Sequence, residues 1–517
     1  MSDIFFASLD IGTTGVKALI VNQSGKVKAT AYRTYPCEYP KPGWFEQDVI
    51  IMWEKICEAA RESIYKANIP IRNIKSLGIS SQRGTFIPVD KHLKPLMNSI
   101  VWADTRADKE LNIILRGISK ERYHEITGVY PSPIWSYAKI KWFIDNKQDL
   151  FARTFKILNG QEYFLSKLGA EELSTDPSSL TMNGMLEIDK LDWSKELCDI
   201  IGLPMDKLPV VGTPARTVGN ISKDAAHETG FPEGMPIAIG GGDQQCTAIG
   251  AGVVREGMAV VILGTGGAVI AQIDSRKRDE QQKVVIGGSC IPGKWDMEGL
   301  QAIAGGTLKW WQEKFAPLEN KAADDLGLDV FKIIDLEAAK SPPCSNGLIF
   351  FPFFQGQSTP NYDYCAKGGL LGISFIHDKK DIMRAIMEGT VFELNMIKEA
   401  MEDVLGKKFD SLRVAGGGAK SYLWNQIQAD IYGKTVEKPE VPECANLGAA
   451  ISGAVGCNYF NSIEEGVEQM VNVAQRIEPI EKNHKLYKKA FDIFKKAFNV
   501  LLRNNINKEL AEFQKEF

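Results

Sequence analysis

Long apolar runs are missing from this chain of 517 residues. No stretch of about 18 apolar residues occurs, so no segment is expected to cross a membrane. The nine cysteines are scattered without a C-x-x-C pair, which indicates reduced thiols rather than a disulfide framework. No basic region precedes the first apolar stretch, so we expect a cytoplasmic protein without a signal peptide. The net charge of −4 offers no general attraction to nucleic acid or to anionic membranes.

Several well-known nucleotide and metal motifs are missing too. No G-x-G-x-x-G follows the first apolar run, which argues against a nicotinamide dinucleotide fold. The triplet Gly433-Lys434-Thr435 imitates the end of a P-loop, but Gln428 stands where that motif requires glycine. The H-R-D and D-F-G elements of protein kinases are absent. The five histidines include no H-E-x-x-H, so no metal-ligand cluster is expected.

What is present indicates a large α/β protein. The hydrophobic content of 44% and charged content of 24% are typical of a soluble globular chain, and the length exceeds one ordinary core. Apolar patterns predict strands within 4–36, at 74–79 and at 236–242, and helices at 48–67 and 243–250. Strands that alternate with helices in this way favour an α/β fold with two domains.

The first strand and turn carry the most suggestive chemistry. An apolar run brings one carboxylate, Asp10, to its tip, and Gly12-Thr13-Thr14-Gly15 follows. The glycines allow close approach of a ligand to the backbone, and successive N–H groups with threonine hydroxyls can bind an anion. The pattern predicts a metal–nucleotide site, although an ordinary hairpin with a chance aspartate has the same appearance.

The opening pattern returns about halfway along the chain. Residues 257–271 form another apolar strand, Gly/Thr turn and apolar strand, and residues 412–418 form another strand that ends in glycines. We interpret this as an internal duplication with a boundary near residue 252. The alternative is coincidence, because Gly/Thr hairpins are common.

Two carboxylates, Asp10 and Asp243, follow strands and lie beside glycines. Phosphoryl transfer requires a metal ion that bridges phosphate oxygens and a base that receives the acceptor's proton. One aspartate for each role would meet that requirement. Asp243 has a second interpretation as a helix N-cap, because a strand, glycines, an aspartate and a helix follow in that order.

Together these motifs resemble the FGGY family of carbohydrate kinases over essentially the whole chain. The resemblance implies two actin-like, ribonuclease H-type domains with a cleft between them, 1–252 binding the sugar and 253–517 binding ATP. The matching elements are Leu9-Asp10-Ile11-Gly12-Thr13-Thr14-Gly15, Trp102-Ala103-Asp104-Thr105-Arg106, Gly241-Gly242-Asp243-Gln244-Gln245, Leu263-Gly264-Thr265-Gly266-Gly267, Gly416-Gly417-Gly418-Ala419-Lys420-Ser421 with Trp424-Asn425, and Asn446-Leu447-Gly448-Ala449-Ala450.

The resemblance also implies a role for each matching residue, with ATP and Mg²⁺ as cofactors. Asp243 would be the general base, and Asp10 would hold Mg²⁺ and help to position the γ-phosphate. The remaining contacts fall into two groups. The nucleotide would be bound by Gly12, Thr13, Thr14, Gly264, Thr265, Gly266, Gly417, Gly418, Ala419 and Asn425. The sugar pocket would be lined by Gln82, Arg83, Trp102, Asp104 and Gln244.

The substrate is less sharply indicated. Xylulose kinases resemble this chain but continue Met-His-Gly after the glutamine of the pocket, whereas here Gln82 precedes Arg83-Gly84. Glycerol kinases continue Arg-Glu-Thr, so Gly84 replaces their glutamate, and Ile134 stands where they place a tyrosine. The lost glutamate leaves room beside Arg83, which favours a ketopentose such as xylulose.

Other outcomes remain open at this stage. Glycerol, another polyol or autoinducer-2 are alternative substrates, and an actin-like ATP-binding regulator is the alternative without enzymatic activity. Both Asp10 and Asp243 are present, which favours an active kinase. The resemblance also allows a homodimer, and we expect no nucleic-acid or membrane partner.

Overall fold

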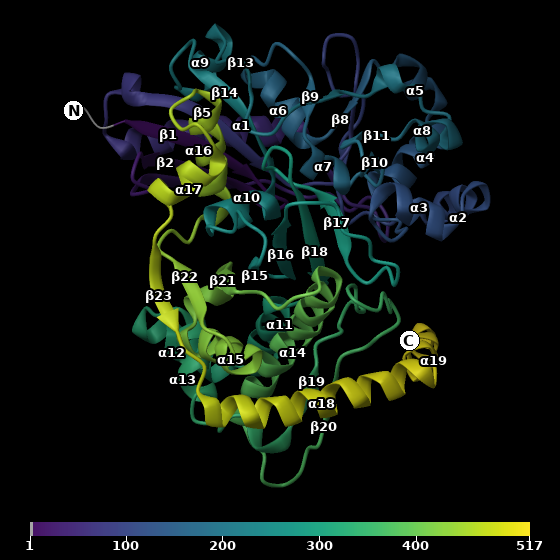
Figure 1. The fold of residues 1–517 in the computed structure, drawn as a ribbon, viewed down its shortest axis with the longest axis vertical. Helices are drawn as coiled ribbons and strands as arrows, with labels where there is room; N and C mark the ends of the chain where they lie inside the picture. The colour runs from purple at the N-terminus through teal and green to yellow at the C-terminus, as the bar shows by residue number, and fades with distance from the viewer. Residues whose placement is uncertain (1–3) are drawn as a thin grey trace. The chain divides into compact units, whose positions relative to one another are not determined.

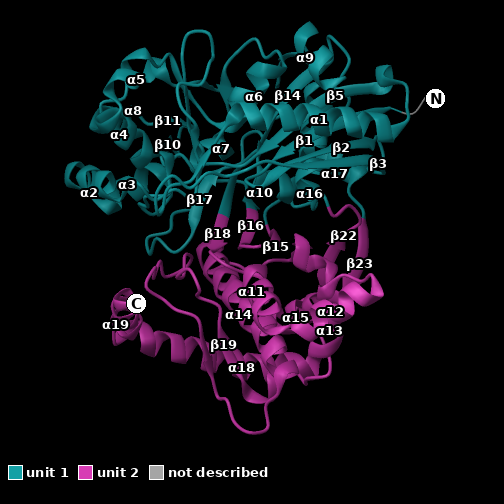
Figure 2. Ribbon diagram, turned by 180° about the vertical axis from the view of Figure 1, so that it is seen from behind, with its two compact units in different colours: residues 1–256, 272–297, 443–472 teal, residues 257–271, 298–442, 473–517 magenta. Residues whose placement is uncertain are grey.

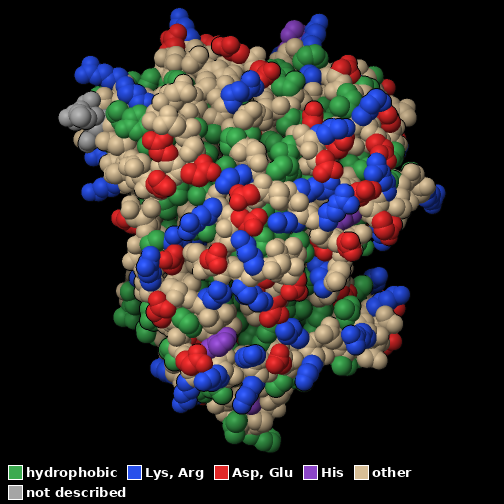
Figure 3. Space-filling view, viewed as in Figure 1, with side chains coloured by type: hydrophobic (Ala, Val, Ile, Leu, Met, Phe, Trp, Pro, Cys, Tyr) green, Lys and Arg blue, Asp and Glu red, His purple; other side chains and the backbone are tan. Residues whose placement is uncertain are grey.

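The computed structural model describes residues 4–517 and has an α/β fold, as predicted (Figure 1). The chain forms two compact units, coloured separately in Figure 2. Unit 1 comprises residues 1–256, 272–297 and 443–472, and unit 2 comprises residues 257–271, 298–442 and 473–517. Lys and Arg side chains are interspersed with Asp and Glu side chains over the face shown in Figure 3. Within residues 4–517, no helix is long and apolar enough to cross a membrane.

The central sheet of unit 1 has the strand order β13-β14-β5-β1-β2-β3. Strands β1, β5 and β14 run parallel, and β1, β2 and β3 form an antiparallel meander, as the sequence predicted for residues 4–36. The strands are β13 (Thr217–Asn220), β14 (Pro236–Gly242), β5 (Ile74–Ser81), β1 (Phe5–Ile11), β2 (Gly15–Asn22) and β3 (Val27–Thr34).

Helices cover both faces of this sheet. Alternate residues of β1, from Phe5 to Ile11, lie in one core with α1 (Val49–Ala67) and α6 (Gly160–Leu168). The opposite face of the sheet contacts α16 (Cys444–Gly456). At this contact the Asn446 amide donates a hydrogen bond to the Ser8 hydroxyl. Helix α10 (Asp243–Gly250) packs closely on α16. Asp10 follows Ser8 by two residues, so its side chain points to the α16 face. The predicted helices at 48–67 and 243–250 are confirmed.

Smaller elements complete unit 1. Helices α2 to α6 make up most of residues 108–168. These further elements are α2 (Asp108–Gly117), α3 (Lys120–Thr127), α4 (Ser136–Asn146), α5 (Gln148–Arg153), α7 (Pro177–Thr181), α8 (Lys195–Ile201), α9 (Lys223–Thr229), α17 (Ile463–Met470), β4 (Glu46–Gln47), β6 (Ile87–Val89), β7 (Ser99–Ile100), β8 (Lys156–Leu158), β9 (Ser174–Thr175), β10 (Leu186–Glu187), β11 (Asp192–Trp193), β12 (Val210–Val211) and β17 (Val285–Gly288).

The second large sheet repeats the order of the first. Its strands follow the order β17-β18-β16-β15-β21-β22-β23, so the antiparallel β15–β16 hairpin has a parallel neighbour, β21, as β1–β2 has β5. This shared topology confirms the predicted internal repeat. The strands are β18 (Trp295–Gln301), β16 (Gly267–Ile273), β15 (Met258–Leu263), β21 (Ser411–Ala415), β22 (Val436–Pro439) and β23 (Val473–Ile477).

Helices of unit 2 pack around its part of that sheet. Helix α18 (Glu481–Arg503) buries its aromatic side, because its Phe494 packs on Phe351 and Phe392. The remaining elements are α11 (Gly305–Phe315), α12 (Pro317–Leu326), α13 (Val330–Ala338), α14 (Lys379–Leu405), α15 (Tyr422–Tyr432), α19 (Ile506–Phe513), β19 (Ile349–Phe351) and β20 (Gly369–Leu371).

Candidate active site

Asp10 lies near the carboxyl end of β1, beside Ser80 on the neighbouring parallel strand β5. The Ser80 hydroxyl donates a hydrogen bond of 2.8 Å to Asp10 Oδ1. Burial, assisted by the negative charge of Asp243, raises the pKa of Asp10 to about 6. Asp243 follows β14, which runs parallel to β5, so the two carboxylates lie at the same edge of the sheet.

The turn after Asp10 is tied to the adjoining loop. Thr13 donates through its hydroxyl to Gln82 Oε1 at 2.8 Å, and Gln82 donates to Gln47 Oε1 at 2.8 Å. Gln47 in turn donates to the backbone carbonyl of Thr13 at 2.6 Å, which closes a ring of three residues. Both ends of the Gln82 amide are therefore engaged within the protein. Thr14, in contrast, is exposed at the tip of the turn.

The Trp102–Arg106 segment presents its tryptophan and buries its aspartate. Trp102 is 39% exposed, and its indole N–H donates to the Thr13 hydroxyl at 3.0 Å. Asp104 is 0% exposed and accepts from the Phe45 N–H at 2.7 Å and from the Arg106 guanidinium at 2.8 and 2.9 Å. Arg106 also lies over the Trp44 ring. The Asp104 carboxylate thus holds the loop that carries Trp102.

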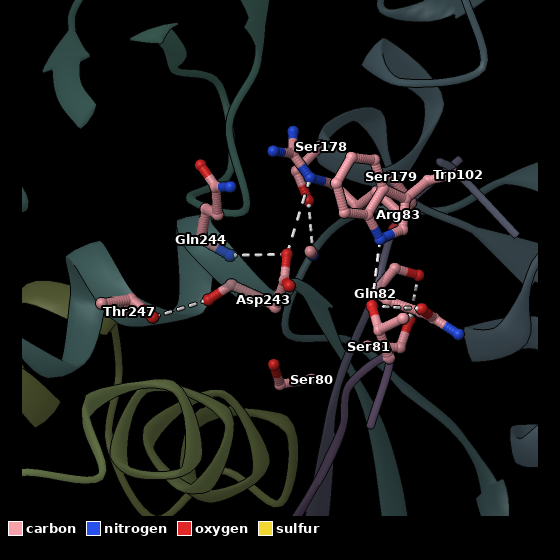
Figure 4. Close-up of polar contacts among 12 residues, drawn as sticks. Ser80, Ser81, Gln82, Arg83, Trp102, Ser178, Ser179, Asp243, Gln244 and Thr247 are labelled. Atoms are coloured by element: carbon pink, nitrogen blue, oxygen red, sulfur yellow. Dashed lines mark hydrogen bonds and ion pairs between the residues drawn. The ribbon is translucent and has the colours of Figure 1, made fainter. Parts of the chain in front are cut away.

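Asp243 is the first residue of α10, and Gly242 is the N-cap, so the N-cap interpretation of Asp243 was wrong. Its Oδ1 accepts from the Gln244 N–H at 2.9 Å and lies 3.9 Å from Nε of Arg83 (Figure 4). The Asp243 side chain is 39% exposed, whereas the Arg83 side chain is 2% exposed. A β-carbon on Gly242 would overlap with the Arg83 side chain, so glycine is required for this arrangement. The Gln244 Oε1 is buried and accepts no hydrogen bond within residues 4–517.

Sequence reasoning missed the residues behind Asp243. The Gly242 N–H donates to the Ser178 hydroxyl at 3.0 Å, and Ser178 donates to the buried carboxylate of Asp176. Ser179 and Gln161 donate to the other Asp176 oxygen, each at 2.7 Å. The available signal was the order Asp176-Pro177-Ser178, a helix start within a polar segment.

The nucleotide-motif residues of unit 2 also come together. The Gly264 N–H donates to the Gly266 carbonyl at 3.0 Å, which closes the β15–β16 turn. The N–H groups of Gly305 and Gly306 donate to the carbonyls of Gly264 and Thr265 at 2.9 and 3.0 Å. These two glycines at the start of α11 were not identified from the sequence. Their N–H groups tie the start of α11 to the hairpin and so fix the shape of the turn.

The glycines after β21 lie against the same strand as this hairpin. A β-carbon on Gly416 would come within 2.6 Å of the Leu263 carbonyl, and one on Gly418 would overlap with the Leu263 side chain. A β-carbon on Gly417 would meet nothing within 4 Å, so the backbone there is open to a ligand. The Asn425 amide donates to the Ala419 carbonyl at 2.9 Å and fixes this turn.

The carboxylates do not form an all-protein metal cage. Among residues 4–517, no group of three or more His, Cys, Asp or Glu side chains is placed to hold a metal ion. Mg²⁺ in kinases is commonly held by one or two carboxylates together with substrate phosphates. Asp10, a half-buried carboxylate beside a phosphate-type turn, fits that mode of binding.

Comparison with known families identifies the class. The model of the FGGY family of carbohydrate kinases, N-terminal domain, matches residues 5–250, and the model of its C-terminal domain matches residues 259–457. The chain therefore belongs to the FGGY family of carbohydrate kinases and is an enzyme of that class. The predictions of the family and of a kinase are confirmed, and the non-enzymatic alternative is wrong.

The similar proteins include kinases with different names. Xylulose kinase of Bacillus subtilis (strain 168) is 30% identical over 514 residues, which cover 99% of each chain. Gluconokinase of the same organism is 26% identical over 511 residues, 99% of this chain and 98% of that protein. A ligand-bound xylulose kinase from Lactobacillus acidophilus has a TM-score of 0.87 at 23% identity, covering 96% of this chain and 98% of that one.

A further structural neighbour is a glycerol kinase from Plasmodium falciparum with ADP. It superimposes with a TM-score of 0.83 at 23% identity, covering 96% of this chain and 98% of that one. These structures confirm the predicted two-domain, actin-like fold.

Proposed function

We propose that this carbohydrate kinase transfers the γ-phosphoryl group of Mg-ATP to a hydroxyl of a ketopentose such as xylulose. The observation that carries the proposal is the placement of Asp243: a partly exposed carboxylate at the start of α10, with the buried Arg83 guanidinium beside it. Such a carboxylate can accept the proton of a sugar hydroxyl, and the cation can orient a neighbouring sugar oxygen.

The sugar would be bound by side chains that lie around Asp243. We assign direct contacts to Arg83, Trp102 and Gln244, whose buried carbonyl oxygen has no protein donor within residues 4–517. Gln82 and Asp104 belong to the same pocket, but their hydrogen bonds are made to the protein. Their proposed role is to hold Trp102 and the β1–β2 turn in place.

The nucleotide would be bound by the glycine-rich turns. We assign Mg²⁺ and the phosphates to Asp10, Gly12, Thr13 and Thr14 in residues 1–252. In residues 253–517, Gly264, Thr265 and Gly266 would bind phosphates, and Gly417, Gly418, Ala419 and Asn425 would face the adenosine. Bound Mg²⁺ would neutralise charge on the phosphate oxygens. The open backbone at Gly417 supports this assignment.

The proposed reaction is a single displacement. The sugar hydroxyl oxygen forms a bond to the γ-phosphorus while the bond from that phosphorus to the bridging oxygen of ADP breaks. The hydroxyl proton passes to Asp243, and the sugar phosphate and ADP leave. Asp243 has to lie within hydrogen-bond reach of that hydroxyl, which its exposed carboxylate permits.

The preference for a ketopentose rests on Gly84. This residue has φ +67° and no side chain, and the nearest atom to a β-carbon there would be Cβ of Trp102 at 3.3 Å. Trp102 and Met182 pack against Gly84, so the preference for a substrate larger than glycerol rests on the missing glutamate and not on open space at Gly84 itself. Gluconate is the second candidate, because a gluconokinase is similar over almost the whole chain.

A coupled ADP-release screen tests the proposal directly. The panel comprises xylulose, ribulose, glycerol, erythritol, gluconate and autoinducer-2. We expect xylulose to give the highest kcat/KM. A higher kcat/KM for glycerol or gluconate would contradict the substrate assignment.

A further inference from the structure

We propose that Lys139 is a positioning residue for the sugar pocket: its ammonium group joins the loop that carries Arg83 to the segment that carries Trp102. This inference rests on the proposed function, which assigns sugar contacts to Arg83 and Trp102. Lys139 itself lies on α4 and contacts neither the proposed base nor the nucleotide turns.

The Lys139 ammonium makes three hydrogen bonds to backbone carbonyls. It donates to Gly84 at 2.9 Å, to Val101 at 3.0 Å and to Trp102 at 3.2 Å. The side chain is completely buried. An ammonium has three N–H groups, so this set uses every donor that Lys139 possesses.

Replacing Lys139 by an apolar residue would be unfavourable for the carbonyls that it contacts. Three carbonyl oxygens converge on one buried point, and a neutral, apolar side chain would remove the donor that they share. The Val101 carbonyl would still accept from the Asp104 N–H at 3.1 Å, whereas the Gly84 and Trp102 carbonyls would lose the ammonium. Burial lowers the pKa of Lys139 to about 7, Asp104 opposes that shift and Arg106 adds to it.

The two joined segments are the ones that the sugar would touch. Gly84 directly follows Arg83, and it has no side chain that could anchor its loop. Cβ of Trp102 lies 3.3 Å from where a β-carbon on Gly84 would be, so the two segments are in close contact at this point. Movement of the backbone at the Gly84 and Trp102 carbonyls would therefore change the distance between the Arg83 and Trp102 side chains.

Helix α4 holds the Trp102 segment at a second point. Trp142, one turn after Lys139, lies 4.9 Å from the Arg106 guanidinium, measured to the ring centroid. Arg106 pairs with Asp104 at 2.8 Å. Residues three apart share one face of a helix, so Lys139 and Trp142 together form a platform beneath this segment.

The test compares Lys139→Met with Lys141→Met, its matched control. Lys141 lies on the same helix and pairs with Asp145 near the surface. Steady-state KM values are measured for ATP and for whichever of xylulose, gluconate and glycerol the unchanged enzyme phosphorylates. Hydrogen exchange of the amides in 83–86 and 101–106 is measured in parallel. Arg83→Ala and Trp102→Ala are assayed alongside to test the pocket itself.

We expect Lys139→Met to raise the sugar KM at least about tenfold while the ATP KM stays within about twofold. Exchange in 83–86 and 101–106 should become faster, and Lys141→Met should change neither quantity. A folded Lys139→Met enzyme with an unchanged sugar KM would overturn the inference. So would loss of folding in both Lys139→Met and Lys139→Gln, because Lys139 would then be a general core residue.

The controls separate this inference from the proposed function. If Arg83→Ala and Trp102→Ala leave the sugar KM unchanged, the proposed pocket is wrong. In that case unchanged exchange in 83–86 and 101–106 overturns the inference about Lys139 as well, and faster exchange supports its role in holding the two segments.

Discussion

Nε of Arg83 lies 3.9 Å from Oδ1 of Asp243, and the Arg83 side chain covers Gly242 so closely that a β-carbon there would overlap with it. A buried cation thus lies beside the carboxylate that we propose as the base. The pair arises from two distant segments, the end of β5 and the start of α10, which the parallel pairing of β5 with β14 brings together.

Arg83→Ala should raise the sugar KM about 10- to 100-fold and leave the ATP KM nearly unchanged. The physical reason is the loss of charge-assisted hydrogen bonds to the sugar, each worth about 1.5–3 kcal/mol. Steady-state kinetics with each substrate varied in turn measure the effect. Arg122→Ala is the control, because Arg122 pairs with Glu196 at the surface. An unchanged sugar KM would remove Arg83 from the pocket.

Ser178→Ala should lower kcat about 2- to 10-fold with little change in either KM. The hydroxyl accepts the Gly242 N–H at 3.0 Å, and losing this bond of about 0.5–1.5 kcal/mol would loosen the start of α10 that positions Asp243. Ser179→Ala is a matched control, since Ser179 bonds to the same Asp176 but not to Gly242. Equal kcat values for the two variants would contradict this role.

Gly448→Ala should destabilise the protein by about 1–3 kcal/mol. A β-carbon at Gly448 on α16 would overlap with the Cys246 carbonyl on α10, so the two helices would have to separate. Thermal or urea unfolding measures the change. Gly117→Ala is the control, because the nearest atom to a β-carbon there would be 3.6 Å away, and it should not destabilise. Equal stability of the two variants would contradict the close helix packing.

The sugar KM should rise as the pH increases from about 7 to about 9. Burial lowers the pKa of Lys139 to about 7, so above that pH the amine has two N–H groups for three carbonyls. The folded-state pKa lies below the unfolded value of about 10.4, so the cost of burying this charge declines as the pH rises between these two values, and stability increases with pH. Unfolding therefore does not explain the loss. A pH profile of the sugar KM that is identical in Lys139→Met would contradict this prediction.

The features that the sequence predicted are local ones. They are the turn at Gly12–Gly15, its repeat at 264–267 and the strand-to-helix junction at Asp243. Each lies within a few consecutive residues, so the sequence pattern alone indicates it. The residues that escaped prediction act across long distances. Ser178 bonds to Gly242, and Lys139 bonds to Gly84, through contacts that depend on how separate elements pack. A serine or lysine in a polar or helical stretch carries no local sign of such a partner.

The cap of α10 shows the limit of local patterns. Asp243 follows glycines and precedes a helix, which is typical of an N-cap, yet Gly242 is the N-cap and Asp243 is the first helical residue. The tertiary contact between the Gly242 N–H and Ser178 fixes the helix start one residue earlier. The Asp243 carboxylate therefore belongs to the first turn of α10, and its side chain is 39% exposed.

The most direct test of the account is the Asp243→Asn variant in the ADP-release assay with the preferred sugar. Asparagine has nearly the same shape but cannot accept the proton, so kcat should fall at least about 100-fold. ATP affinity, measured by calorimetry, and the melting temperature should stay close to those of the unchanged enzyme. Turnover near the level of the unchanged enzyme would show that Asp243 is not the base and would contradict the proposed mechanism.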